Sequence, residues 1–318
     1  MMDTKRSEIK KSVFKIIKKL VFKQWVIGIC SSSIESIIKT KKFDPEIKWL
    51  FPPSLDKFYA DPFLLPMEGE NIKILFEEYK FKSEYGELAL MTVDTNFGKI
   101  ANKSLLDTKS HLSYPLIITQ DNKHFVFPEA AESGKLSCYE YDPLKEQLNY
   151  LKDILPIPLL DTTIVKYENK FWLLGVMGDN NSTYSLHIFY SENLLGPYEP
   201  HTYNPVRSGL NGIRPAGNII EVDGSIYRPT QNCENNYGES ISINKIVKLS
   251  ETDFIEEFYM DISINKKRKS NKEIHSIHTI NHIENIIVVD GKRWTFSPFH
   301  QYKKYLRDKK KSNKLENS

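Results

Sequence analysis

The chain repeats one pattern: an apolar strand that begins at a polar or proline-containing corner, then a tight polar turn, then a second strand rich in aromatic residues. Four copies can be aligned, over residues 113–127, 160–174, 214–228 and 278–289. A fifth copy with a longer turn runs from Ala60 to Glu78. The turn centres lie 53, 47, 55 and 61 residues apart, at Gly69, Asn122, Asn169, Gly224 and Asn285. A repeat of about fifty residues with several strands per period is typical of a β-propeller.

The turns explain why each copy is expected to form a hairpin. Asp223-Gly224 supplies two residues that tolerate a positive φ, as a type I′ turn requires, and Asn stands at the same place in three other copies. The flanking Ile, Val, Phe, Tyr and Trp residues favour strands over helices. An all-β sandwich is the alternative, because isolated hairpins also occur there. Five copies at similar spacing favour a ring, so the sequence predicts an all-β, five-bladed β-propeller over residues 25–300.

Composition limits the classes of function. The 318 residues, of which 40% are apolar and 12% aromatic, are enough for one ring of five blades. A net charge of +3 is too small to indicate nucleic acid as a partner. Three widely spaced cysteines without a CxxC motif predict reduced thiols, with no metal site and no cofactor. No apolar run approaches the roughly twenty residues that span a bilayer, so we expect a cytoplasmic protein.

The first 24 residues differ from the repeats. They predict a helix over Lys10–Lys23 with Val13, Ile16, Ile17, Leu20 and Val21 on one side and Lys11, Lys15, Lys18, Lys19 and Lys23 mainly on the other. Such a basic amphipathic helix could lie on an anionic membrane surface, which would make the protein peripheral on the inner membrane face. Docking on the side of the propeller is the alternative. Residues 301–318 are predicted to form a basic tail.

Ring geometry indicates where the chemistry should lie. The first strand of each blade lines the channel of a propeller, so residues at equivalent strand starts converge on one mouth. At these starts stand Asp61, Tyr114, Asp161, Arg214 and His278. The second strands add, near the same level, Glu77, Glu78, Glu129 and Arg228. Carboxyl groups gathered in one cleft push their pKa values apart, which makes an acid and a base from one residue type.

Each candidate also has a structural alternative. Asp61 and Asp161 could cap turns. Arg214 and Arg228 could pair with carboxylates of the chain instead of binding a phosphate or carboxylate of a ligand. His278 could be a hydrogen-bonded structural residue. For Glu129, which follows an apolar strand, a functional or paired charge is the commoner case.

Several short motifs occur together between Trp25 and Trp294. They are Tyr59-Ala-Asp-Pro-Phe63, Phe76-Glu-Glu78, Tyr114-Pro115 with Pro128-Glu129, Arg214-Pro-Ala-Gly217 with Tyr227-Arg-Pro229 and Gln231, Tyr237-Gly238, and His278-Thr279 with Val289-Asp290-Gly291. In combination they resemble the N-terminal propeller domain of plant glucosamine inositolphosphorylceramide transferases, of which bacterial stand-alone versions occur. That domain is similar to the five-bladed propellers of glycoside hydrolase families 43 and 32. The resemblance implies carbohydrate chemistry at the channel mouth.

The catalytic residues of the resembling hydrolases have only partial counterparts in this chain. In family 43 a first-blade Asp is the general base and a third-blade Asp orients the acid, and Asp61 and Asp161 match these two by position. The general-acid Glu of that family stands in the fourth blade, where this chain has Arg214-Pro-Ala-Gly217. Glu129, or else Glu78, could replace the missing acid. The arginines would suit a sugar nucleotide or a lipid-linked phosphosugar better than a neutral glycan.

We therefore expect a transferase of glycosyl groups in the assembly of a bacterial capsule or O-antigen-like polysaccharide. The expected catalytic residues are Asp61 as base, Asp161 as positioning carboxylate and Glu129 as acid or sugar ligand. The expected substrate-binding residues are Glu78, Tyr114, Arg214, Arg228, Gln231 and His278. The partner would be a glycan or sugar phosphate, with a lipid-linked form as one option. A hydrolase that uses water as acceptor and a non-catalytic glycan-binding module that serves a separate transferase are the alternatives.

Overall fold

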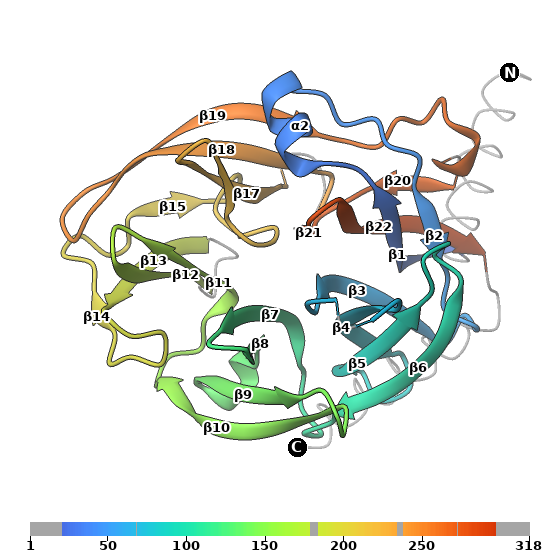
Figure 1. The fold of residues 1–318 in the computed structure, drawn as a ribbon, viewed down its shortest axis with the longest axis horizontal. Helices are drawn as coiled ribbons and strands as arrows, with labels where there is room; N and C mark the ends of the chain where they lie inside the picture. Colours follow the sequence, from blue (N-terminus) through green and yellow to red (C-terminus); the bar gives the residue numbers. More distant parts are fainter. Residues whose placement is uncertain (1–20, 68, 179–183, 234–237, 272, 297–318) are drawn as a thin grey trace, which may run out of the picture.

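The computed structural model describes residues 21–67, 69–178, 184–233, 238–271 and 273–296. Within these ranges the strands form five antiparallel sheets, which follow one another around a common centre in the order of the sequence (Figure 1). The predicted five-bladed β-propeller is confirmed, and the sandwich alternative is wrong.

Four blades are each built from one continuous stretch of chain. Blade 1 contains β3 (Lys57–Leu64), β4 (Ile72–Lys80), β5 (Tyr85–Val93) and β6 (Lys99–Leu106). Blade 2 contains β7 (Ser113–Gln120), β8 (Lys123–Glu129), β9 (Leu136–Asp142) and β10 (Gln147–Leu155), with a 3-10 turn at Ala131–Ser133. Blade 3 contains β11 (Leu160–Tyr167), β12 (Lys170–Gly178), β13 (Tyr184–Ser191) and β14 (Glu199–Pro200), and β15 (Arg207–Gly209) also pairs with β13. Blade 4 contains β16 (Ile220–Val222), β17 (Ser225–Asn232), β18 (Ser240–Leu249) and β19 (Phe254–Ile262).

Blade 5 joins the two ends of the described chain. Its inner strands are β21 (Ile280–Ile283) and β22 (Ile286–Phe296), and its outer strands are β1 (Val21–Ser31) and β2 (Lys48–Leu50). The short strand β20 (Ile274–Ser276) also pairs with β22, and a 3-10 turn at Lys269–Asn271 precedes it. β1 and β22 pair along the full length of both strands. This antiparallel pair closes the ring.

Three of the predicted turns have the predicted conformation, whereas at Glu284-Asn285 only Glu284 has a positive φ. Both central residues have a positive φ at Asp121-Asn122, Glu168-Asn169 and Asp223-Gly224. These angles belong to type I′ turns, whose twist matches the twist of the flanking strands. The hairpin prediction is therefore confirmed at the level of the backbone.

The boundary of the N-terminal segment needs a correction. Residues 10–20 of the predicted helix lie outside the described residues, but Val21, Phe22 and Lys23 belong to strand β1 and not to a helix. Pairing with the end of β22 holds these three residues extended. The short helix found near this end is α2 (Ile34–Thr40), between β1 and β2. In the described part of the chain, no helix has the length and apolar character to cross a membrane.

Apolar side chains pack between neighbouring blades. One cluster joins blades 1, 2 and 3, and three more lie between blades 3 and 4, blades 4 and 5, and blades 5 and 1. Helix α2 buries Ile34, Ile37 and Ile38 in the cluster between blades 4 and 5. The packing fixes each blade against the next, and this holds the inner strands in register around the centre.

Candidate functional site

Three of the inner strands carry the same bulge near their start. In β3, β7 and β11, the pairing with the second strand of the blade shifts by one residue at this place. One residue within each bulge has a positive φ, of 49° at Asp61, 42° at Tyr114 and 45° at Asp161. That conformation costs a residue with a side chain roughly 1–2 kcal/mol, and such strain is concentrated at functional sites. Because a bulge re-aims a side chain, the three equivalent positions are set apart from the rest of their strands.

A cavity of about 280 Å³ lies at this end of the inner strands. Its volume is near the lower end for ligand sites. Its acidic lining residues, from blades 1 to 3, are Asp61, Glu77, Glu129 and Asp161. The basic lining residues are His111, Arg214 and His278, and the aromatic ones are Trp25, Phe58 and Tyr79. The cavity thus brings acids and bases together in a mostly buried space.

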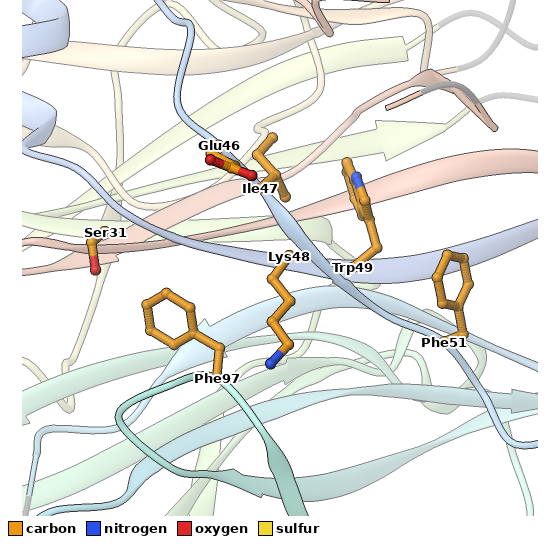
Figure 2. A pocket seen from close by; sticks show the side chains of 7 residues that line it. All are labelled: Ser31, Glu46, Ile47, Lys48, Trp49, Phe51 and Phe97. Carbon is orange, nitrogen blue, oxygen red and sulfur yellow. The ribbon is translucent and has the colours of Figure 1, made fainter. Parts of the chain in front are cut away.

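A second hollow of about 660 Å³ lies at the outer edge of the ring. Figure 2 shows its lining, which comes from the β1–β2 segment of blade 5 and, with Phe97, from the β5–β6 turn of blade 1. Its single carboxylate, Glu46, is exposed, and Lys48 donates a hydrogen bond to the carbonyl oxygen of Asn96 at 3.0 Å. This hollow is larger, but both of its charged side chains are exposed, whereas the central cavity holds several buried ones, so the chemistry points to the central cavity.

Asp61 belongs to a chain of hydrogen bonds that ends at Asp290 in β22. The His278 Nδ1 atom lies 2.6 Å from Asp290 Oδ2, and its Nε2 atom lies 3.7 Å from Asp61 Oδ1. The Thr279 hydroxyl donates to Asp61 Oδ1 at 2.7 Å. Asp290 also accepts hydrogen bonds from the backbone N–H groups of Asp61, His278 and Thr279. The indole of Trp25 stacks on the imidazole, with ring centroids 4.0 Å apart.

Asp161 is held from three sides. Its Oδ2 atom accepts hydrogen bonds from Arg214 Nε at 2.5 Å and from Gln231 Nε2 at 3.1 Å. Its backbone N–H donates to Glu129 Oε2 at 3.0 Å. The Tyr114 hydroxyl accepts a hydrogen bond from the Gly217 N–H at 2.6 Å. The arrangement orients Asp161 and connects it directly to Glu129.

Burial and neighbouring charges shift the pKa values of the acidic groups. Burial and the charge of Asp161 raise the pKa of Glu129 above its ordinary value, although Arg214 opposes this. Burial raises the pKa of Asp61 as well, against the opposing effect of His278. For His278, burial lowers the pKa, but the charges of Asp290 and Asp61 outweigh it and raise the pKa above its ordinary value. The cavity can therefore hold an uncharged carboxylic acid and an imidazole–carboxylate pair at the same pH.

Two residues predicted to bind substrate lie elsewhere. Side chains alternate along β4, so Glu77 lines the cavity while Glu78 pairs with Lys57 at 2.9 Å and accepts from Asn102 at 3.2 Å. The guanidinium of Arg228 is fully buried and pairs with Glu256 of β19 at 2.6 Å. Both predictions needed the face of the strand on which each side chain lies, and a single sequence does not fix the strand register that decides it.

Most of the remaining predicted residues come together as expected. Asp61, Glu129, Asp161, Arg214 and His278 line the cavity. Gln231 donates to Asp161, one of these lining residues, whereas the Tyr114 hydroxyl bonds to the Gly217 N–H and to the Thr163 hydroxyl and not to an acidic group. The geometry thus supports convergence on one end of the ring, while the assigned roles stay predictions.

From the sequence, Glu77 was placed near this level but given no role, and Trp25, Phe58, Tyr79, His111 and Asp290 were not predicted as site residues. A signal existed for Asp290, because a charge directly after the apolar run Ile286–Val289 needs a buried partner. A signal existed for Glu77 as well, because only one of two adjacent strand residues can face the channel. His111 stands in the connection between β6 and β7, where the alternation of side chains along a strand does not apply and does not predict which way the ring points.

Asp61, His278 and Asp290 lie close enough together to share a metal ion. Both oxygens of Asp290 already accept hydrogen bonds from backbone N–H groups, and Oδ2 also faces the imidazole. These bonds already engage both oxygens of Asp290. The expected absence of a metal cofactor stays a prediction.

Comparisons with known proteins agree with this picture. Residues 51–294 match the family model described as glucosamine inositolphosphorylceramide transferase 1, N-terminal. Glucosamine inositolphosphorylceramide transferase 1 from Arabidopsis thaliana is 32% identical over 251 residues, which cover 75% of this chain and 32% of that protein. The protein of the same description from Oryza sativa subsp. japonica is 28% identical over 218 residues, which cover 67% of this chain and 29% of that protein. The chain therefore spans about a third of the length of these relatives.

A solved structure shares the fold. A family 117 glycoside hydrolase produced by the marine bacterium Zobellia galactanivorans superposes with a TM-score of 0.54 and covers 88% of this chain and 92% of its own. The two sequences are 12% identical. At that identity the likeness concerns the fold alone.

Proposed function

This chain belongs to the family of glucosamine inositolphosphorylceramide transferase 1 N-terminal domains, and on that premise we propose that it is a carbohydrate-active protein that transfers glycosyl groups. The observation that carries the proposal is the central cavity, in which buried carboxyl groups face an arginine and a histidine. Glycosyl transfer needs a base for the acceptor hydroxyl and stabilisation of the leaving group. The cavity holds candidates for both.

Asp61 is the proposed base. Its Oδ1 atom already accepts a hydrogen bond from the Thr279 hydroxyl, and the His278 imidazole lies close to the same oxygen. Asp290 positions that imidazole through a contact of 2.6 Å. A proton taken from an acceptor hydroxyl by Asp61 would be stabilised by this pair.

Glu129 is the proposed acid, and Asp161 is a positioning residue. Burial and Asp161 raise the pKa of Glu129, so it keeps its proton to a higher pH than an ordinary glutamate. It could give that proton to the leaving oxygen. Arg214 lines the same cavity and would offset negative charge on a leaving phosphate, while its Nε atom holds Asp161 in place.

We place the reaction in the assembly of a bacterial surface polysaccharide, in the cytoplasm at the inner face of the membrane. The support for this setting is the match to the family and the basic segment of residues 10–20. The acceptor or donor there would be a lipid-linked glycan.

The test replaces Asp61 with Asn in full-length protein and measures surface polysaccharide in cells that depend on it. Asp61→Asn keeps the size of the side chain and removes the base, so transfer should fall by roughly a hundredfold or more. The matched control is Glu78→Gln, a neighbouring buried carboxylate outside the cavity, which should retain transfer. Unchanged polysaccharide in the Asp61→Asn cells would reject catalysis by this cavity, and release of free sugar instead of a new glycoside would identify a hydrolase.

A glycan-binding module is the second candidate. The observation in its favour is that the chain spans only about a third of the Arabidopsis relative, 32% of its length. A part of a larger enzyme can hold the glycan while another part performs the chemistry. In that case Asp61→Asn would leave polysaccharide output intact, whereas substitutions that block the cavity would abolish it.

A further inference from the structure

One wall of the cavity carries polar groups that the proposed reaction does not use. Glu77 of β4 and His111, which stands just before β7, both line the cavity. The Glu77 side chain is 6% exposed, and among the described residues its Oε1 atom finds no hydrogen-bond partner. Buried polar atoms in proteins are almost always paired, so an exception that faces a cavity indicates a ligand group.

A backbone hydrogen bond selects one tautomer of the His111 ring. The backbone N–H of Gly86 donates a hydrogen bond to His111 Nδ1 at 3.0 Å, which makes Nδ1 an acceptor and leaves the ring proton on Nε2. Burial lowers the pKa of His111, which favours this uncharged ring. The Nε2 atom lies 3.8 Å from Glu77 Oε1, too far for a direct hydrogen bond. A fixed donor and an unused acceptor therefore stand side by side.

Gly86 holds these two groups in place. Its N–H binds His111, and its carbonyl oxygen accepts from the Leu112 N–H at 2.9 Å. A Cβ atom at residue 86 would stand 2.5 Å from Glu77 Oε1 and 2.6 Å from the carbonyl oxygen of Leu112. Only glycine allows this close approach, so the backbone at residue 86 sets the positions of the His111 ring and the Glu77 carboxylate.

An aromatic wall adjoins the pair. Phe58 and Tyr79 line the same cavity and stack on one another, with ring centroids 4.6 Å apart and an interplanar angle of 2°. The Tyr79 and His111 ring centroids are 6.2 Å apart. A ligand that touches this wall needs an apolar face beside a group that both accepts and donates a hydrogen bond. A pyranose ring with a free hydroxyl has both features.

We propose that Glu77 and His111 form a specificity subsite that binds one hydroxyl group of a sugar ring. The hydroxyl oxygen accepts from His111 Nε2 and donates its hydrogen to Glu77 Oε1, and the sugar ring lies against Phe58 and Tyr79. Two polar atoms 3.8 Å apart can both be reached by one oxygen at about 2.9 Å from each. This inference rests on the proposed function, since it assigns the substrate class of the same cavity.

The test follows the His111 ring in full-length protein by nitrogen NMR while methyl pyranosides of glucose, galactose, mannose and glucosamine are added. In the free protein, Nδ1 should be unprotonated and Nε2 protonated. Binding of a pyranoside should shift the Nε2 signal. A protonated Nδ1, or no shift with any of the four sugars, would overturn the proposal.

A thermodynamic cycle, which combines a substitution at Glu77 with removal of single hydroxyl groups from the sugar, then tests whether Glu77 binds one hydroxyl. Glu77→Met should weaken binding of the parent pyranoside by about tenfold or more, because the bound hydroxyl loses the acceptor for its hydrogen. For the one monodeoxy analogue that lacks the bound hydroxyl, the same substitution should have no effect. Glu78→Gln, on the other side of β4, is the control and should bind every analogue as wild type does. Equal weakening for all analogues would assign Glu77 a merely structural role.

The two proposals fail separately. Asp61→Asn should keep the His111 shift while it loses transfer. A normal shift together with normal transfer in that variant would reject the proposed base and retain the subsite. Loss of transfer in Asp61→Asn, with no response of His111 in wild type, would reject the subsite and retain the base.

Discussion

Asp61 and Asp161 share one strained backbone conformation but differ in their partners. Both stand in a bulge with a positive φ, at 49° and 45°. Asp61 faces a histidine and a hydroxyl, which can exchange protons, whereas Asp161 faces Arg214 and Gln231, which fix its orientation. The same local fold thus supplies two chemical roles, and the difference comes from the neighbouring blades.

Glu129 gives a test of the acid role through its effect on stability. Because its pKa is raised in the folded state above the ordinary 4.5, the folded protein holds a proton there that the unfolded chain has lost. Rising pH therefore lowers the stability of wild type above about pH 4.5, by at most about 1.4 kcal/mol per unit. Glu129→Gln carries no such proton, so its melting temperature should exceed that of wild type by a margin that grows with pH, while transfer activity falls.

Thermal unfolding from pH 4 to pH 8 checks this expectation. The control is Glu221→Gln at an exposed position of β16, which removes one negative charge outside the cavity. A margin that stays constant with pH, or one that shrinks as pH rises, would contradict a raised pKa at Glu129.

Contacts between inner strands of different blades fix the shape of the cavity. The Gly217 N–H binds the Tyr114 hydroxyl of blade 2, and the Gly217 carbonyl accepts from Thr163 of blade 3 at 3.2 Å. On its other side, Gly217 lies against the backbone of Ile280 in blade 5. Gly217, three residues before β16, therefore touches three other blades, which explains why glycine stands there.

Gly217→Ala should destabilise the ring strongly. Residue 217 has a φ of 132°, and an added Cβ atom would overlap the carbonyl oxygen of Ile280, so roughly 3 kcal/mol or more should be lost from the free energy of unfolding. Gly224→Ala is the matched control, because its φ of 70° is also positive but a Cβ atom there meets nothing within 4 Å. The control should lose only about 1 kcal/mol. Chemical denaturation measures both, and equal losses would show that backbone strain alone accounts for the effect.

The elements differ in how well the sequence predicts them. The hairpins were predictable because Asp223-Gly224 and the Asn-centred turns act locally on φ. The choice between Glu77 and Glu78 was not, because a shift of one residue moves every side chain of a strand to its other face. Asp290 was missed as a site residue because its partners, Asp61 and His278, lie 229 and 12 residues away along the chain. Contacts of that kind depend on closure of the ring, and the repeats do not encode them one by one.

Closure of the ring by the β1–β22 pair places β1 beside the cavity. β1 pairs with β22 from Val21 to Ser31, and its fifth residue, Trp25, lines the cavity and stacks on His278. At about 3.3 Å per residue, Val21 stands roughly 13 Å from Trp25 along the strand. The described chain therefore begins roughly 13 Å along the strand from a residue that lines the cavity.

The whole molecule should bind anionic membranes through residues 10–20. These residues lie outside the described part of the chain, but in a helix Val13, Ile16, Ile17 and Leu20 would oppose Lys15, Lys18 and Lys19. Each lysine near anionic lipid contributes about 1 kcal/mol, in addition to apolar burial. Co-sedimentation with anionic vesicles at low salt should therefore exceed that with neutral vesicles, and salt should reduce the difference.

Two sets of substitutions distinguish binding through this segment from binding through the overall positive charge of the protein. Changing Lys15, Lys18 and Lys19 to Gln should remove most of the preference for anionic vesicles, whereas changing Lys309, Lys310 and Lys311 of the tail should remove little. The two triple variants have the same net charge, so a difference between them reports position. If both variants bind equally well, or if wild type binds neither kind of vesicle, the segment packs against the propeller instead. The cavity would then take its glycan from solution, because no membrane would hold a lipid-linked substrate within reach of Trp25 and His278.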